Sequence, residues 1–402
     1  MNPTISPTNS RMSVVDALRG FALMAIVLLH SIEHYNLFHT PEWQPQWLSG
    51  LDSAVTDVVW FLLAGKAYAT FSLLFGFSFY IQMRNARLRG VDFRLRFAWR
   101  MLLLAGFAQL HALFYNGDIL LFYAVCGLIL IPASSWSNRT VLIVAGILLL
   151  QPIDWIHMLT AHFSPDYIDT NSRFVAFAAS AEQTAMNGNL LQTLSNNIIN
   201  GQLYSNFWQV EAGRICQTPA LFLLGMWLGR NEMFVKSQRS MRFWQRTLLL
   251  SLLAFGPLYL LKTFISPMLS HTTWVSHFGI ALGLPVNFTL MTIFVSLFVI
   301  CWFKKGDGYR FQRISITYGR MSLTNYITQS IIGVTLFYNF GLGLFRYSGA
   351  TISMLIGLGI ILLQVWWSNG WLSTHRQGPL EALWKRLTWL SFNRVSNPIA
   401  TK

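Results

Sequence analysis

Arg19 and His30 lie on the first long apolar segment of the chain, eleven residues apart. At about 100° per residue in a helix, the two side chains project from nearly the same face, roughly 16 Å apart along the axis. If the segment spans a membrane, it carries a guanidinium near one surface and an imidazole deep in the bilayer. Ionisable groups are costly inside a membrane, so the pair is a candidate functional site.

His30 offers several kinds of chemistry. A buried neutral imidazole can act as a nucleophile or a general base, and it can also simply hydrogen-bond between helices. His34 follows one turn later, so the two rings share a face if the helix persists. A zinc pair would need a third ligand, and the sequence has no His-Glu-x-x-His pattern. We expect no metal at this pair.

Three further ionisable residues lie on apolar segments. Lys66 is near the middle of the second segment, too deep for easy contact with either surface. It either forms an ion pair, with Asp57 as the candidate partner, or faces a cavity through which an anionic group passes. His111 and Asp118 flank the turn at 115–117. Asp118 either caps the next helix or orients the imidazole, as in nucleophile-activating dyads.

Less specific residue spacings indicate a second set of candidate site residues. Glu211 and Arg214 have the i, i+3 spacing typical of a surface ion pair. Asn325 and Gln329 are one turn apart, which suits hydrogen bonding between helices or the lining of a cavity. The secondary candidates for the site are His34, His39, Arg214, Asn325 and Gln329.

The composition is that of a membrane protein. Of 402 residues, 53% are hydrophobic and 11% charged, with a mean hydropathy of +0.44, whereas soluble domains carry roughly 25% charged residues. The first apolar segment lacks a small-residue cleavage site, so we expect it to be retained. We predict an all-α polytopic membrane protein of about ten transmembrane helices, at residues 14–32, 55–82, 98–115, 119–133, 140–158, 215–229, 247–267, 278–303, 322–339 and 350–372.

Basic residues predict the orientation. With the N-terminus inside, most of the 29 lysines and arginines fall in inner loops or inner tails, so both termini are expected to face the cytoplasm. This bias and anionic lipid headgroups account for the net charge of +14, and no nucleic acid is expected as a partner. The inner tails include Arg11, Arg394 and Lys402.

We expect one membrane domain over residues 1–402, with two five-helix halves at 12–160 and 211–402. Residues 161–210 between them interleave asparagines with leucines and isoleucines. That pattern suits an amphipathic segment that lies on the outer leaflet or covers a cavity. The three cysteines fall on separate helices, and no CxxC or phosphate-binding loop is present. A thiol redox centre and an ATP-driven pump are therefore not expected.

Several motifs resemble the YeiB-like membrane proteins, which carry domain of unknown function 418. The opening Asp16-Ala17-Leu18-Arg19-Gly20 resembles the Asp-x-x-Arg-Gly signature of that family. Further matching motifs are Gly65-Lys66-Ala67, Gly117-Asp118-Ile119-Leu120, Leu224 to Arg230, Gly319 to Tyr326 and Gly378-Pro379-Leu380-Glu381. The resemblance covers nearly the whole chain and implies a multi-pass protein of the bacterial inner membrane.

The family is similar, at the level of a superfamily, to the ten-helix transmembrane acyltransferases. That resemblance implies that acyl-CoA or acetyl-CoA supplies an acyl group from the cytosol to a lipid or glycan acceptor at the outer face. Arg19 and His30 resemble the Arg-x10-His signature of the sugar O-acyltransferases, and the segment around His39 resembles the N-acetyltransferase branch. We favour His30 as the catalytic histidine.

The expected roles follow from this resemblance. The CoA phosphates would be held by Arg19, Arg94, Arg96 and Arg100. His30 would act as nucleophile or base, Lys66 or an amide would stabilise the oxyanion, and His111 with Asp118 would assist. The alternatives are a transporter or lipid-binding protein that uses Lys66, His111 and Asp118 as a relay, and a structural or signalling subunit whose buried polar residues only join helices. Membrane lipids are expected partners in every case.

Overall fold

The computed structural model describes residues 12–41, 43–170, 172–305 and 310–390, which are helices and connecting loops with no strand. The predicted all-α class is confirmed. Arg11, Arg394 and Lys402 lie outside the described residues. The α-helices are α1 (Ser13–His30), α2 (Gln46–Leu63), α3 (Lys66–Arg87), α4 (Arg94–Ala112), α5 (Leu120–Gly127), α6 (Leu130–Ala133), α7 (Asn138–Leu149), α8 (Pro152–Phe163), α9 (Val175–Asn187), α10 (Leu190–Asn196), α11 (Gln202–Glu211), α12 (Arg214–Arg230), α13 (Gln238–Ile265), α14 (Thr272–Lys305), α15 (Arg310–Arg320), α16 (Ser322–Phe337), α17 (Ala350–Thr374) and α18 (Pro379–Thr388).

Long apolar helices characteristic of a membrane protein run through this fold. Among the described residues, five helical stretches are long and apolar enough to cross a bilayer, and α7 with α8, bent by 46°, makes a sixth if counted as one span. Several of the other predicted spans coincide with shorter helices, since α5, α12 and α16 contain 8, 17 and 16 residues. The five stretches are Ser13–Tyr35, Gln46–Arg87, Gln238–Met268, Thr272–Lys305 and Ala350–Thr374.

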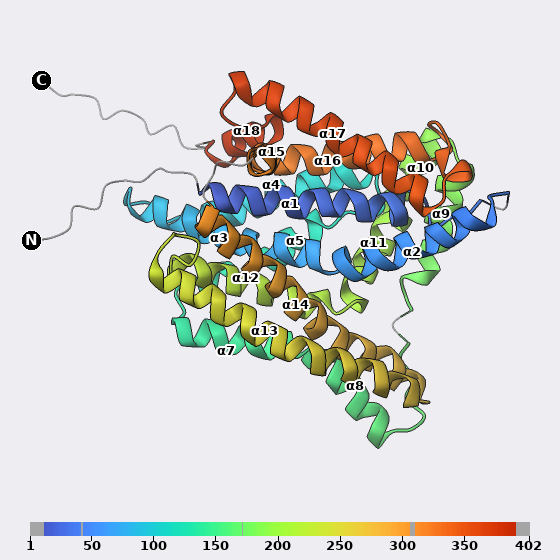
Figure 1. The fold of residues 1–402 in the computed structure, drawn as a ribbon, viewed down its shortest axis with the longest axis horizontal. Helices are drawn as coiled ribbons and strands as arrows, with labels where there is room; N and C mark the ends of the chain where they lie inside the picture. Colours follow the sequence, from blue (N-terminus) through green and yellow to red (C-terminus); the bar gives the residue numbers. More distant parts are fainter. Residues whose placement is uncertain (1–11, 42, 171, 306–309, 391–402) are drawn as a thin grey trace, which may run out of the picture.

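Two helical layers meet along α3. On one side α3 contacts α1, which packs on α15, and on the other side α3 contacts α12, which packs on α7. The apolar core fills the space between α1, α3, α4, α5, α12 and α14. The C-terminal ends of α3, α12 and α14 lie toward the same end of the molecule as α18, and α9 and α10 lie at the opposite end (Figure 1). These helix ends and the starts of α4 and α13 hold many of the basic residues that predict the cytoplasmic side.

Two glycines allow α1 and α15 to approach closely. A Cβ added to Gly20 would lie 1.9 Å from the carbonyl oxygen of Ser315, and one added to Gly319 would lie 1.9 Å from that of Asp16. No real Cβ tolerates such contacts with backbone, so either change must push the helices apart. Both glycines neighbour an arginine, Arg19 or Arg320, and their close packing fixes where these guanidinium groups lie.

Gly20→Ala is therefore expected to destabilise the protein by roughly 1–3 kcal/mol, the usual cost of overpacking. The thermal unfolding temperature of the purified protein in detergent measures this loss. Gly106→Ala is the matched control, because Gly106 also lies within a helix but its added Cβ meets nothing within 4 Å. If both variants unfold at the wild-type temperature, α1 and α15 do not pack this closely.

Candidate functional site

A cavity of about 1250 Å³ contains both Arg19 and His30 in its wall. Its lining comes from α1, α3, α4, α5, α11, α12, α15, α16 and α18, so both halves of the chain contribute. One end, at α18, is lined by five cations that we call the basic mouth; they are Arg84, Arg89, Arg100, Arg320 and Lys385. The other end holds a group that we call the histidine end; its members are His30, Glu33, His34, Trp208 and Arg214.

The basic mouth combines positive charge with indole surfaces. The guanidinium of Arg100 lies 3.5 Å from the ring centre of Trp384, and that of Arg89 lies 5.1 Å from the ring of Trp389. Two carboxylates also line the cavity here. Glu232 lies 3.5 Å from Arg84, and Glu381 accepts hydrogen bonds from the backbone at the start of α16. Cations outnumber carboxylates, so the mouth attracts anions.

Arg19 lies on α1 between the two ends. Its Nη1 is 2.6 Å from Asp16 Oδ1, and its Nη2 donates a hydrogen bond to Ser78 on α3. The Asp16 carboxylate is buried, whereas the Arg19 side chain keeps 21% of its surface exposed. The guanidinium is thus held in a fixed orientation at the cavity wall.

Two arginines predicted to hold the donor do not line the cavity. Arg94 turns away to bind the exposed carboxylate of Asp92 at 2.7 Å, and this hydrogen bond lowers the pKa of Asp92 to about 2. Arg96 donates to the backbone oxygen of Thr388 at 3.0 Å and packs on Trp389. Sequence proximity grouped these residues with Arg100, but Arg94 binds Asp92, and Arg96, one turn before Arg100, binds the end of α18 without lining the cavity.

The histidine end forms because α1 continues beyond His30 as a π-helical turn, Ser31–Tyr35. The wider turn keeps His30 and His34 on one face, with ring centres 5.5 Å apart. The shared face predicted from the sequence is therefore present. Tyr115 lies 5.4 Å from the His30 ring, and Trp208 lies 6.4 Å from the His34 ring. Aromatic side chains thus enclose both imidazoles.

His111 and Asp118 lie together directly behind this end. His111 Nδ1 is 2.7 Å from Asp118 Oδ1, and both side chains are buried. The second carboxylate oxygen accepts hydrogen bonds from the backbone of Leu120 and Leu121 at the start of α5. Asp118 therefore orients the imidazole and caps the helix at once, the two roles that the sequence left open. Neither side chain lines the cavity.

Three buried polar atoms gather at this place without a hydrogen-bond partner among the described residues. They are Nδ1 of His30, Nε2 of His111 and the hydroxyl of Tyr115. The Tyr115 ring lies between the two imidazoles, 5.4 Å from His30 and 5.5 Å from His111. Buried polar groups normally find partners. Their concentration beside a cavity is typical of a site that binds a polar ligand.

Arg214 and Glu33 add a guanidinium and a carboxyl group to the histidine end. The predicted surface pair of Arg214 with Glu211 is wrong, because Glu211 binds Arg173 and Arg214 faces the cavity. The Arg214 guanidinium packs between the rings of Tyr68 and Trp208, at 4.2 and 4.1 Å, and donates to Gln209. A guanidinium fixed in this way can bind a carboxylate or phosphate group.

Other predicted site residues lie outside the cavity wall. The second apolar segment is interrupted at Gly65 (φ 77°), so Lys66 begins α3, where its Nζ lies 3.4 Å from the Trp60 carbonyl. No ion pair between Lys66 and Asp57 occurs among the described residues. His39 packs against Phe345. These positions follow from the break between α2 and α3 and from the π-helical turn.

Asn325 and Gln329 lie on the buried side of α16. The Asn325 amide donates to the Tyr318 carbonyl and to Ser368, each at 3.1 Å, and thereby joins α16 to α15 and α17. The Gln329 side chain is buried and has no hydrogen-bond partner in the described residues. Asn325 thus matches the predicted hydrogen bonding between helices, and neither residue lines the cavity.

The segment at 161–210 folds over the histidine end. Its predicted amphipathic character is distributed over α9, α10 and α11. Trp208 and Gln209 of α11 line the cavity, and Ser205 donates a hydrogen bond to the backbone oxygen of Asp118 at 2.7 Å. Of the two predicted roles, the cover over a cavity agrees with these contacts.

The chain is similar to several known proteins, none of which has an established function. Residues 228–391 match a family model described as "Protein of unknown function (DUF418)". An uncharacterized protein YxaH of Bacillus subtilis is 27% identical over 100% of this chain and 98% of its own length. Uncharacterized protein YeiB of Escherichia coli is 29% identical over 96% of this chain and 98% of its own length. The chain is thus similar over nearly its whole length to proteins described as uncharacterized, and its C-terminal part matches the DUF418 model.

An uncharacterized 39.9 kDa protein in the amylase 3' region of Bacillus acidopullulyticus is also similar, at 25% identity over 95% of this chain and 94% of its own length. No solved structure matches the chain. The DUF418 region includes Arg320, Glu381 and Lys385, so it supplies part of the basic mouth. His30, Arg19 and Arg214 come from the part that precedes it.

Proposed function

We propose that this chain is a transmembrane acyltransferase that moves an acyl group from cytosolic acyl-CoA to an acceptor at the outer face. The observation that carries the proposal is the continuity of one cavity from the basic mouth to the histidine end. Phosphate-binding groups and a candidate catalytic imidazole thereby share one space. A lipid or glycan hydroxyl or amine is the acceptor that we propose.

The basic mouth suits the nucleotide part of CoA. Guanidinium and ammonium groups bind phosphate oxygens, and arginine does so with two parallel hydrogen bonds. Trp384 and Trp389 lie among these cations and offer flat apolar surfaces for a purine. The pantetheine arm would then pass Arg19 toward His30, and the apolar walls at Phe71 and Phe75 suit that arm.

His30 provides the base for transfer in this proposal. The acceptor hydroxyl or amine attacks the thioester carbonyl, its proton passes to the imidazole, and the C–S bond breaks as the thiol leaves with a proton. In the covalent alternative, the imidazole first takes the acyl group while the thiol leaves with the ring proton. The acceptor then attacks the acyl-imidazole, the C–N bond breaks, and the acceptor's proton returns to the ring. Arg214, fixed by two rings, is placed to stabilise the oxyanion or to hold an anionic acceptor.

The proposal also includes the topology predicted from the sequence: ten spans, both termini in the cytoplasm and an inner-membrane location. Many basic residues lie at the ends of α3, α12 and α14, toward α18, and they support this topology because positively charged connections between spans remain inside (Figure 1). Reporter fusions in the loop at 88–93 and after α18 are expected to report cytoplasmic positions. A periplasmic signal from either fusion would contradict this topology.

Binding of CoA by the purified protein in lipid nanodiscs tests the donor site. Arg19→Gln is expected to weaken binding by roughly 10- to 150-fold, since a charge-assisted hydrogen bond contributes about 1.5–3 kcal/mol. Arg89→Gln, at the exposed rim of the basic mouth, is expected to weaken it less and to reduce its dependence on salt. Equilibrium dialysis with labelled acetyl-CoA, repeated at several salt concentrations, gives the dissociation constant of each variant.

Arg94→Gln is the matched control, because Arg94 is also an exposed arginine of the same region but binds Asp92 outside the cavity. Its CoA affinity should equal that of the wild type. Equal losses in Arg89→Gln and Arg94→Gln would indicate binding by general surface charge. Absence of CoA binding by the wild-type protein would contradict the proposed function.

The transporter alternative has less support from the geometry. Its relay would consist of Lys66, His111 and Asp118, but none of these three side chains lines the cavity. Lys66 contacts the Trp60 carbonyl at the break between α2 and α3. A proton or anion relay needs its polar side chains along one continuous path through the membrane. The three side chains do not line such a path, whereas acyl transfer needs its reacting groups together only at the histidine end.

A further inference from the structure

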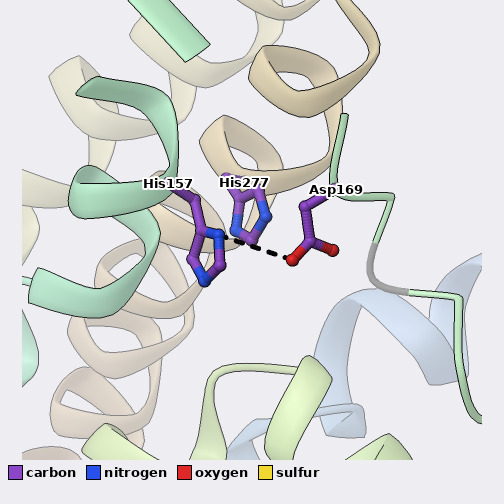
Figure 2. A group of neighbouring side chains, drawn as sticks. All are labelled: His157, Asp169 and His277. Carbon is purple, nitrogen blue, oxygen red and sulfur yellow. Dashed lines mark ion pairs between the residues drawn. The ribbon is translucent and has the colours of Figure 1, made fainter. Parts of the chain in front are cut away.

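A second cluster of polar side chains lies away from the cavity, where α8, the loop at 164–170 and α14 meet. His157 comes from α8, Asp169 from the loop and His277 from the first turns of α14 (Figure 2). One ligand atom from each residue lies within 4.8 Å of the other two. None of the three lines the cavity described above. The acyltransferase proposal does not use them.

The carboxylate of Asp154 orients the imidazole ring of His277. His277 Nδ1 is 2.8 Å from Asp154 Oδ1, and both residues are buried. The ring nitrogen is the donor in this contact, which leaves the lone pair on Nε2. A histidine that binds a metal through one ring nitrogen usually donates a hydrogen bond from the other to a carboxylate. This bond fixes the orientation of the ring and makes the metal-binding nitrogen more basic.

His157 faces Asp169 at the separation expected of two ligands on one metal. Its Nδ1 lies 3.4 Å from Asp169 Oδ2. Two atoms that each bind zinc at 2.0–2.2 Å in a tetrahedral site are about 3.4 Å apart. The two imidazoles are parallel, with ring centres 4.4 Å apart, and each offers a ligand atom within 4.8 Å of the other's. The hydroxyl of Tyr167 forms a hydrogen bond of 2.6 Å with His157 Nδ1, which a metal bound to that nitrogen would displace.

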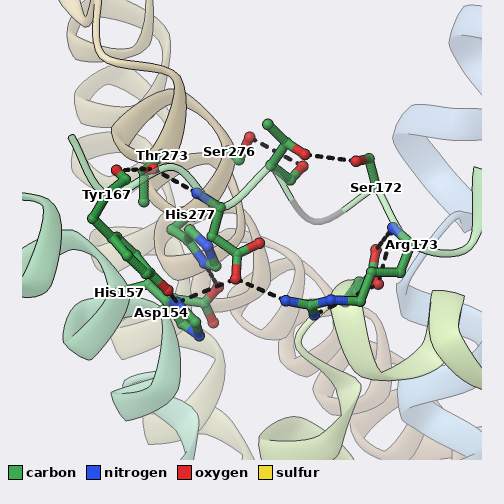
Figure 3. A network of polar contacts seen from close by, with 11 residues as sticks. Asp154, His157, Tyr167, Ser172, Arg173, Thr273, Ser276 and His277 are labelled. Carbon is green, nitrogen blue, oxygen red and sulfur yellow. Dashed lines mark hydrogen bonds and ion pairs between the residues drawn. The ribbon is translucent and has the colours of Figure 1, made fainter.

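The loop that carries Asp169 is fastened at this position. The backbone N–H of Asp169 donates to Thr273 Oγ1 at 2.9 Å, and this hydroxyl donates to the Tyr167 carbonyl at 3.3 Å (Figure 3). Thr273 is fully buried on α14, one turn before His277. The backbone of the loop therefore helps to hold the carboxylate toward the histidines, in addition to the ion pairs of the carboxylate itself.

The surrounding charges favour a cation. Asp154, Asp169 and Glu211 are buried, and the guanidinium that contacts two of them belongs to Arg173 (Figure 3). Its Nη2 is 3.0 Å from Asp169 Oδ2, and its Nη1 is 3.8 Å from Glu211 Oε1. Carboxylates outnumber guanidinium groups in this network. The Arg173 side chain is 58% exposed, so it can leave Asp169 for Glu211 when another cation arrives.

We propose that His157, Asp169 and His277 form a binding site for a divalent transition metal, with zinc as the best fit. Two imidazoles and one carboxylate are a ligand set that zinc prefers, and magnesium and calcium prefer oxygens alone. The ion joins α8 and α14 to the loop that leads into α9. This site is independent of the proposed acyl transfer, and its metal is expected to stabilise the fold.

Zinc titration of the untagged, chelator-treated protein in detergent tests the site, with a chromogenic zinc indicator as competitor. The wild type is expected to bind one zinc ion at saturation and to unfold at a higher temperature with zinc than with magnesium. His157→Ala, His277→Ala and Asp169→Asn should each lower the affinity by roughly 100-fold or more, and Asp154→Asn by roughly 10- to 100-fold through the lost orientation. Bound Co²⁺ should give visible absorption bands in the wild type and not in the His157→Ala, His277→Ala and Asp169→Asn variants.

His162→Ala is the matched control, since His162 is an exposed histidine of the same helix outside the cluster. It should bind zinc as the wild type does. Arg173→Gln separates a metal site from a simple ion-pair network: removal of the competing guanidinium should leave zinc affinity unchanged or increase it. Wild-type zinc affinity in both His157→Ala and His277→Ala would overturn the proposal. So would the absence of saturable zinc binding to the wild type.

Discussion

His30→Ala is expected to lower acyl transfer by roughly 10²–10⁴-fold, the usual contribution of a positioned general base. The His30 ring lines the cavity beside Tyr115, with a buried nitrogen that has no hydrogen-bond partner among the described residues. The donor site is at the other end, so CoA affinity should stay close to that of the wild type. Transfer of labelled acetyl groups into extracted lipid or glycan, with CoA binding measured in parallel, separates the two effects.

His39→Ala is the control for this prediction. His39 packs against Phe345 outside the cavity, so its removal should change turnover little. The opposite pattern, with an active His30→Ala variant and an inactive His39→Ala variant, would move the catalytic role to His39. A loss of CoA binding together with turnover in His30→Ala would instead show that the variant disturbs the donor site.

Asp118→Asn is expected to reduce turnover strongly and stability little. An asparagine caps a helix about as well as an aspartate, so the contacts to the start of α5 should survive. The charge that orients His111 disappears, and the amide cannot hold the same tautomer. His111 acts as a positioning residue behind Tyr115, so we expect a loss in turnover of roughly 10²-fold with unchanged CoA affinity.

The unfolding temperature and the turnover of Asp118→Asn must be measured on the same preparation. Unchanged turnover with unchanged stability would show that Asp118 is only a helix cap. Asp92→Asn is a suitable comparison, because Asp92 is an exposed carboxylate of a neighbouring loop whose partner, Arg94, lies outside the cavity. It should leave both quantities unchanged.

The sequence predicted the elements that depend on local pattern. Helical periodicity correctly placed Arg19 and His30 on one face of α1, because an uninterrupted apolar helix leaves little freedom in register. The pairing of His111 with Asp118 was also predictable, since a short turn between two helices brings residues seven apart together. Local spacing sufficed in both cases.

Contacts between distant segments could not be predicted in this way. Arg214 was assigned to a surface pair because Glu211 is three residues away, but the turn at Gly213 (φ 71°) directs it to the cavity. Lys66 was placed in the middle of a helix that Gly65 interrupts. The cluster of His157 and His277 joins α8 to α14, and no motif spacing signals such a contact. Tertiary packing decided each of these positions.

The structure of the protein in nanodiscs with a non-hydrolysable acetyl-CoA analogue tests the central claim most directly. The account predicts the nucleotide at the basic mouth, among Arg89, Arg320 and Lys385, and the acyl carbonyl within about 3.5 Å of the His30 imidazole, the distance of a reactive arrangement. A saturating analogue bound elsewhere, or a cavity that holds only lipid at saturating analogue, would contradict the proposed acyl transfer.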